Sequence, residues 1–252
     1  MKWLLILSVS FLVAQKNYCH AQSDGPILGG KPDADWMTSY YDSPSPERFV
    51  EEVRTPTNAG VFNDRKSQPY FIAFLSQVMA QNPERVERWL KEFEDLDEKQ
   101  RTVVLSAAWY SDTEPAMAYF QKKQLKAWAE QDAPSILKMK VNSPATLDML
   151  WGHFMATGER KPIRRIVSAF QLSNYSGALK RLKESKQTPQ DKKEAWFDAT
   201  FQAAQWSLTS NCTQHPKVLD HCKAIFQDKD TPKPESVWLG LILSQVGPVL
   251  TL

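Results

Sequence analysis

The chain has 252 residues, of which 42% are hydrophobic and only 9 are glycine. This length allows one sizeable core or two small ones, and so few glycines argue against a turn-rich β-fold and against glycine-rich phosphate loops. The formal net charge of +2 falls to zero without residues 1–21, which contain Lys2, Lys16 and no acid. A chain without net charge lacks the positive field that attracts nucleic acid or anionic lipid.

Residues 1–21 have the pattern of a cleaved export signal. Lys2 is followed by an apolar run from Trp3 to Ala14, and Cys19 and Ala21 are the small residues of the expected cleavage site. The run is shorter than the ~20 apolar residues of a membrane-spanning helix. We therefore expect an exported protein, periplasmic or extracellular, with no transmembrane span.

Residues 22–44 have no hydrophobic period and are rich in glycine, proline, serine and aspartate. This composition predicts an extended or disordered lead-in, with Trp36, Tyr40 and Tyr41 as the side chains that would pin its end to the folded body. Residues 45–252 are expected to form a single all-α domain.

A recurring start signal, a capping residue followed by proline, marks the helical part. The pairs are Ser45-Pro46, Asn82-Pro83, Ser143-Pro144 and Thr188-Pro189. Apolar residues then recur at helical spacing. The pattern predicts helical hairpins at 70–81 with 84–95, 98–110 with 115–129, 145–157 with 162–171, and 190–211 with 216–227, and single helices near 175–185 and 235–246.

Such a series of hairpins favours stacked antiparallel hairpins in an irregular, solenoid-like helical repeat. The alternative is a compact helical bundle. Gly158 is expected to end its helix in the left-handed conformation.

The stretch SNCTQHPKVLDHCKAIF, residues 210–226, holds two of the 3 cysteines and two of the 4 histidines. Cys212, His215, His221 and Cys222 are ligand types for tetrahedral zinc. Their spacing matches no standard zinc motif, and adjacent His221 and Cys222 would point about 100° apart on a helix. No metal site is therefore predicted.

Cys212 and Cys222 are instead the candidate disulfide. Without Cys19 the chain has an even count of cysteines, which suits an oxidising compartment. Cys222 is expected about two turns into its helix, so Cys212 must lie beside that turn for a bond to form. We therefore expect the preceding helix to end before Cys212, with the residues that follow running back alongside the next helix. Two separate thiols, with Cys222 buried, are the alternative.

The stretch PESVW, residues 234–238, resembles the catalytic stretch of lytic transglycosylases, where a glutamate acts as general acid on peptidoglycan. The resemblance implies that role for Glu235, but it covers five residues and lacks the glycine-led continuation of that family. The alternative is a glutamate in the first turn of a helix, where its charge suits the helix dipole. Because motifs such as H-E-x-x-H and G-x-S-x-G are also missing, no catalytic residue and no cofactor are predicted.

Other features are interpreted as structural. His153 is expected to be a hydrogen-bonded structural histidine, and Trp89 and Trp151 are expected in the core. The basic runs at 122–126, 160–165 and 180–186 are interpreted as solvated helix faces.

These observations favour an exported, non-catalytic binding or scaffold module of a cell envelope that recognises a protein or peptide partner. Nucleic acid is not an expected partner. The alternative is an envelope glycan-directed hydrolase or lyase whose acids converge only in the fold. The apolar segment 237–252 is the candidate for self-association.

Overall fold

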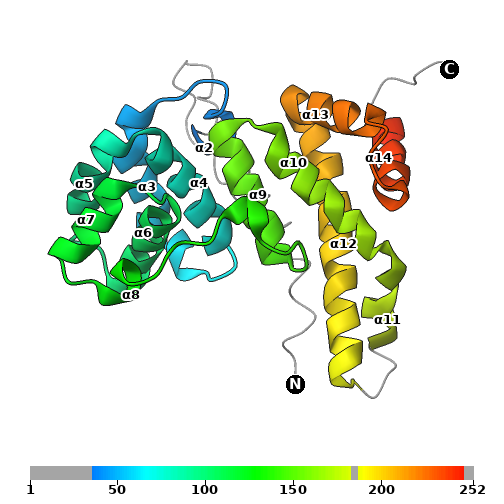
Figure 1. The fold of residues 1–252 in the computed structure, drawn as a ribbon, viewed down its shortest axis with the longest axis horizontal. Coiled ribbons are helices and arrows are strands. Elements are labelled where there is room, and N and C mark those ends of the chain that lie inside the picture. Colours follow the sequence, from blue (N-terminus) through cyan, green and yellow to red (C-terminus); the bar gives the residue numbers. More distant parts are fainter. Residues whose placement is uncertain (1–35, 183–186, 247–252) are drawn as a thin grey trace, which may run out of the picture. The chain divides into compact units, whose positions relative to one another are not determined.

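The computed structural model describes residues 36–182 and 187–246, and every regular element in them is helical (Figure 1). The predicted all-α class is therefore confirmed. The export signal at 1–21, the first part of the lead-in and the end of the apolar C-terminal segment lie outside the described residues.

The chain divides into two compact units, the first ending at Asp132 and the second beginning at Ala133. The division falls in a segment without helix between Ala129 and Ile136. Pro134 lies in this segment, and a proline disfavours helical conformation in the residue before it. Each unit therefore packs its helices against helices of its own half of the sequence.

In the first unit, corresponding helices of neighbouring hairpins pack on each other: α4 on α6, and α5 on α7. This is the stacking of helical-repeat proteins, as the hairpin pattern predicted. The elements of this unit are α2 (Trp36–Ser39), η1 (Pro46–Arg48), α3 (Phe49–Asn58), η2 (Val61–Asn63), α4 (Gln68–Gln81), α5 (Pro83–Glu92), α6 (Glu98–Tyr110), α7 (Glu114–Lys122) and α8 (Lys126–Ala129).

The end of the predicted lead-in belongs to the core of this unit. Trp36 and Tyr40 are 3% and 1% exposed, and the Trp36 ring centroid lies 5.2 Å from that of Phe74. The Trp36 indole also donates a hydrogen bond to Ser45 Oγ at 3.1 Å. Aromatic burial therefore orders the residues that follow Asp35, although their composition is typical of a loop.

The second unit repeats the same stacking, with α9 on α12 and α10 on α13. A 3₁₀ helix, η4, continues directly from α10 and packs on α12 and α14. The elements are η3 (Ile136–Lys138), α9 (Pro144–Thr157), α10 (Arg160–Val167), η4 (Ser168–Tyr175), α11 (Ala178–Leu182), α12 (Pro189–Gln214), α13 (Pro216–Gln227) and α14 (Lys233–Val246).

The helix ends of this unit follow the local sequence. Ser143 Oγ accepts a hydrogen bond from the Thr146 amide at 3.2 Å, and Thr188 forms a capping box with Asp191. Gly158 ends α9 with φ 63°, the left-handed conformation predicted for it. These ends fix where α9, α10 and α12 begin or stop, and thus which residues of α10 face α13.

Candidate functional site

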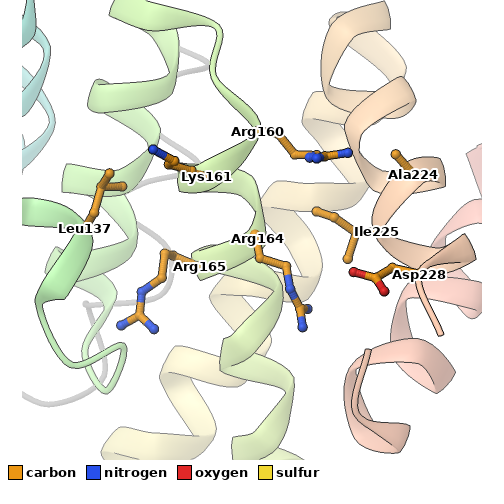
Figure 2. A pocket seen from close by; sticks show the side chains of 8 residues that line it. All are labelled: Leu137, Arg160, Lys161, Arg164, Arg165, Ala224, Ile225 and Asp228. Atoms are coloured by element: carbon orange, nitrogen blue, oxygen red, sulfur yellow. The ribbon is translucent and has the colours of Figure 1, made fainter. Parts of the chain in front are cut away.

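A pocket of about 490 Å³ lies in the second unit between α10 and α13 (Figure 2). The basic run at 160–165 supplies four cationic side chains to it, and they face a single carboxylate. Its lining residues are Leu137, Arg160, Lys161, Arg164, Arg165, Ala224, Ile225 and Asp228.

The spacing of the basic residues in α10 places them in this pocket. Arg160 and Arg164 are four residues apart, as are Lys161 and Arg165, so each pair shares one side of the helix. Figure 2 shows Arg160 reaching toward Ala224 on α13, with Lys161 and Arg165 on the side of Leu137. The remaining residues of the helix, Pro162, Ile163, Ile166 and Val167, are buried. The run is therefore one wall of a pocket, which differs from the plain solvated face that we expected.

Arg164 forms a salt bridge with Glu235, the residue to which the lytic transglycosylase resemblance assigned a catalytic role. Glu235 is only 1% exposed; its Oε2 accepts a hydrogen bond from Arg164, and its Oε1 accepts one from Gln171 Nε2 at 2.7 Å. A general acid must reach its substrate, and here both carboxylate oxygens bind protein groups. Glu235 lies in the first turn of α14, and this geometry favours a structural role that fixes Arg164.

Arg160, Lys161 and Arg165 are not neutralised by a neighbouring acid in the described part of the chain, so their positive charge can act on a ligand. In the ranges 36–182 and 187–246, no carboxylate forms a salt bridge with Arg160, Lys161 or Arg165. Arg165 donates from Nη2 to the Met139 carbonyl at 2.6 Å, but its buried Nε has no hydrogen-bond partner.

The helix dipole strengthens the positive potential at this end of the pocket. Arg160 and Lys161 lie in the first turn of α10, which contains no acid, and Glu159 at the N-cap makes no side-chain capping bond. Cations at a helix N-terminus are unfavourable by roughly 0.3–1 kcal/mol each. An anion bound between them would offset this cost.

A second pocket of about 270 Å³ adjoins the first, since Arg165 lines both. It adds one further cation, Lys140, and several neutral polar groups. Its lining residues are Lys140, Val141, Asn142, Arg165, Ser168, Gln171 and Leu172. The two pockets together form a basic track along α10 and the start of η4.

His153 is a buried histidine of α9 whose pKa is lowered mainly by burial. It is 7% exposed, and burial, with a smaller contribution from the charge of Lys161, lowers its pKa to about 4. Its Nδ1 is buried without a hydrogen-bond partner, so the expectation of a hydrogen-bonded histidine is wrong at this atom. Trp89 and Trp151 are 1% and 3% exposed, which confirms their place in the core.

The four side chains weighed as zinc ligands do not converge. His221 Nε2 lies 2.9 Å from the Gly158 carbonyl oxygen, and His215 is the residue between α12 and α13. Among the described residues, no three histidine, cysteine or acidic side chains are grouped so that they could hold a metal ion.

Cys212 and Cys222, by contrast, lie side by side. Both are buried, and their sulfurs are 3.6 Å apart. The expectation that the preceding helix ends before Cys212 is wrong, because α12 continues to Gln214. Figure 1 shows α13 crossing the end of α12. This crossing brings the two cysteines together, so the residues between the helices do not have to run back along α13.

The apolar C-terminal segment keeps two exposed residues in its described part. Val237 and Leu241 on α14 are 58% and 47% exposed, and Phe226 on α13 is 46% exposed. Self-association through this segment stays a prediction. None of the helices described here has the length and apolar character needed to cross a membrane.

No protein-family model, curated protein or solved structure matches this chain. The pocket between α10 and α13 is the candidate functional site because of its geometry and its charge.

Proposed function

We propose that this protein is an exported binding module of a cell envelope, and that it recognises an acidic segment of a protein or peptide partner through the basic track. The observation that carries the proposal is that four cations of α10 line one pocket, three of them without a salt bridge in the described residues. Surface cations are ordinarily scattered or paired with acids, so this concentration favours an anionic ligand.

The shape of the track favours a peptide over a single small anion. From Arg160 to Ser168 the helical rise gives about 12 Å, which is the length of roughly four residues of extended chain. Guanidinium groups bind carboxylates through two parallel hydrogen bonds. Leu137 and Ile225 add apolar surface beside the cations, suited to the aliphatic stems of glutamate side chains.

The first test is direct binding of a fluorescein-labelled tetraglutamate peptide to the full chain, followed by fluorescence polarisation. Tetraglutamine with the same label is the reference, because it has the same length and hydrogen-bonding groups without charge. We expect tetraglutamate to bind more tightly than tetraglutamine, and we expect its affinity to fall as the salt concentration rises.

A double variant, Arg160→Gln with Lys161→Gln, tests the site. We expect tetraglutamate affinity to fall about fivefold to tenfold, because each exposed charge pair contributes up to about 1 kcal/mol. The fold should be unaffected, since these cations oppose the dipole of α10. Arg164 is left unchanged because it pairs with buried Glu235.

The matched control is Lys180→Gln with Lys192→Gln, which makes the same change in net charge on exposed residues of the same unit outside both pockets. An equal loss of affinity in the control would show that only overall charge matters, and would contradict the proposed site. Equal binding of tetraglutamate and tetraglutamine would contradict it as well. Release of sugar fragments from peptidoglycan by the unmodified chain would instead support the glycan-directed alternative.

A further inference from the structure

The cysteine pair in the hairpin of α12 and α13 is a second chemically distinct feature of this unit. Cys212 lies in the last turn of α12 and Cys222 lies in the middle of α13. Their sulfurs are 3.6 Å apart, whereas a disulfide bond is about 2.05 Å long. A shift of about 1.5 Å therefore separates the two thiols from a bond.

We infer that Cys212 and Cys222 form a disulfide that fastens α13 to α12, and that the oxidant is itself a disulfide, either a small one such as oxidised glutathione or that of a thiol–disulfide oxidoreductase. The contact between the two sulfurs, at 3.6 Å, favours a bond over two independent thiols. Within the described residues neither sulfur belongs to a group that could hold a metal ion, so a metal-bound pair is not favoured.

The exchange proceeds in two balanced steps. The Cys212 thiolate attacks one sulfur of the oxidant, and the other half of the oxidant leaves as a thiolate. Cys222 then loses its proton and attacks Cys212 Sγ, which releases the second half as a thiolate. One disulfide in this chain and two thiols from the oxidant replace the dithiol of this chain and the disulfide of the oxidant.

Cys212 is the better first nucleophile of the pair. The contact with the Cys222 sulfur, with a smaller effect of Lys223, lowers the pKa of Cys212 against the opposing effect of burial, and the thiolate is the reacting form. The same contact and burial raise the pKa of Cys222. Cys212 is also the more exposed of the two, at 3% against 0%.

The bond would fix one wall of the basic pocket, a consequence that rests on the proposed function. Ala224 and Ile225 follow Cys222 on α13 and line the pocket opposite Arg160. The bond itself is independent of any ligand, so its test needs no peptide.

The test uses the full chain with Cys19→Ser, which leaves two cysteines. The folded protein and, separately, protein refolding from denaturant are exposed to oxidised glutathione, quenched with acid and freed of glutathione. Each sample is then alkylated with iodoacetamide in denaturant at about pH 8, where free thiols form the reactive thiolate. Refolding is included because both sulfurs are buried in the folded chain. Intact mass counts the alkyl groups, before and after a reductant is added.

We expect no alkyl group after oxidation in at least one of the two samples, and two after reduction. Trypsin should yield the peptides 194–217 and 218–223 joined by one bond, because Lys217 lies between the cysteines. The single variants Cys212→Ser and Cys222→Ser should each take up one alkyl group after reduction. Uptake of two alkyl groups in both oxidised samples, a lasting glutathione adduct, or a bond between two chains would overturn the inference.

Discussion

The buried polar side chains of the second unit differ in how completely they are paired. Asp198 is fully buried, and its carboxylate accepts hydrogen bonds from the Leu179 amide at 2.9 Å and from Gln202 Nε2 at 2.8 Å. Glu235 is paired just as fully. His153 differs from these two acids, because its Nδ1 is buried without a partner, as are Trp151 Nε1 and Arg165 Nε. Such a histidine is stable only in its neutral form.

His153 therefore makes stability depend on pH. Its pKa is about 4 in the folded chain against an ordinary 6.5. Above about pH 6.5 the ring is neutral in both states, and its contribution is complete. As the pH falls from 6.5 to 4, the unfolded chain takes up the proton first, and the free energy of unfolding drops by about 3 kcal/mol. Below pH 4 this contribution changes no further.

The variant His153→Gln isolates this effect, because glutamine does not titrate. Denaturant unfolding at several pH values should give a free-energy difference between the original chain and the variant that varies between pH 6.5 and 4 and is constant above pH 7. Other titrating groups are present in both chains and cancel in this difference. Parallel stability profiles over the whole range would contradict a depressed pKa for His153.

At the scale of the helices, the four capping residues that precede proline form different hydrogen bonds. Ser143 and Thr188 accept bonds from the amides of their helices. The Ser45 hydroxyl instead accepts a bond from Trp36, and the Asn82 amide donates to the Val78 carbonyl. A start signal in the sequence therefore located helices at all these positions, while tertiary contacts decided how each side chain is used.

Thr188→Ala is the sharpest test of a cap, because Thr188 is exposed and forms a complete capping box. The change removes the acceptor for the Asp191 amide, so we expect the free energy of unfolding to fall by about 1 kcal/mol. Thr188→Ser keeps the oxygen and is the matched control, with an expected loss of only a few tenths. Equal stability of the two variants in chemical denaturation would show that the box contributes nothing.

The sequence alone predicted the helices and their hairpin stacking because both depend on local patterns. Capping, apolar spacing and turn prolines act within a few residues of one another. The basic pocket could not be predicted in the same way. The sequence shows the spacing of Arg160, Arg164 and Arg165 on one helix. The opposite wall of the pocket is formed by α13, which lies about sixty residues later in the chain, so local patterns do not reveal it. The same holds for Glu235, whose partners Arg164 and Gln171 are equally distant in sequence.

The sequence identified Cys212 and Cys222 as a candidate pair, but it did not predict how their sulfurs come into contact. Cysteine count singled out the two residues, whereas the crossing of α13 over the end of α12 decides that their sulfurs meet (Figure 1). Helix crossing depends on the side chains of both surfaces. The requirement that Cys212 lie at the level of Cys222 therefore led to an early predicted end for this helix, whereas α12 continues to Gln214.

At the scale of the whole molecule, the chain divides into two compact units, each with its own packed helices. The sequence did not reveal the boundary, because Ala133-Pro134 resembles the other proline-containing turns of the chain. Each unit nevertheless stacks its own pairs, α4 with α6 in the first and α9 with α12 in the second. Units that bury their apolar surface internally are expected to fold independently.

All residues that line the basic track, and Glu235 behind it, belong to the second unit. We therefore expect a fragment of residues 133–252 to be helical by circular dichroism, to unfold cooperatively, and to bind tetraglutamate within about twofold of the full chain. A fragment of residues 133–232 is the control, because it lacks α14 and leaves Arg164 without its buried partner. It should lose both folding and binding. A cooperatively folded 133–252 fragment that fails to bind would show that the ligand also needs the first unit, and an unfolded one would show that the two cores depend on each other.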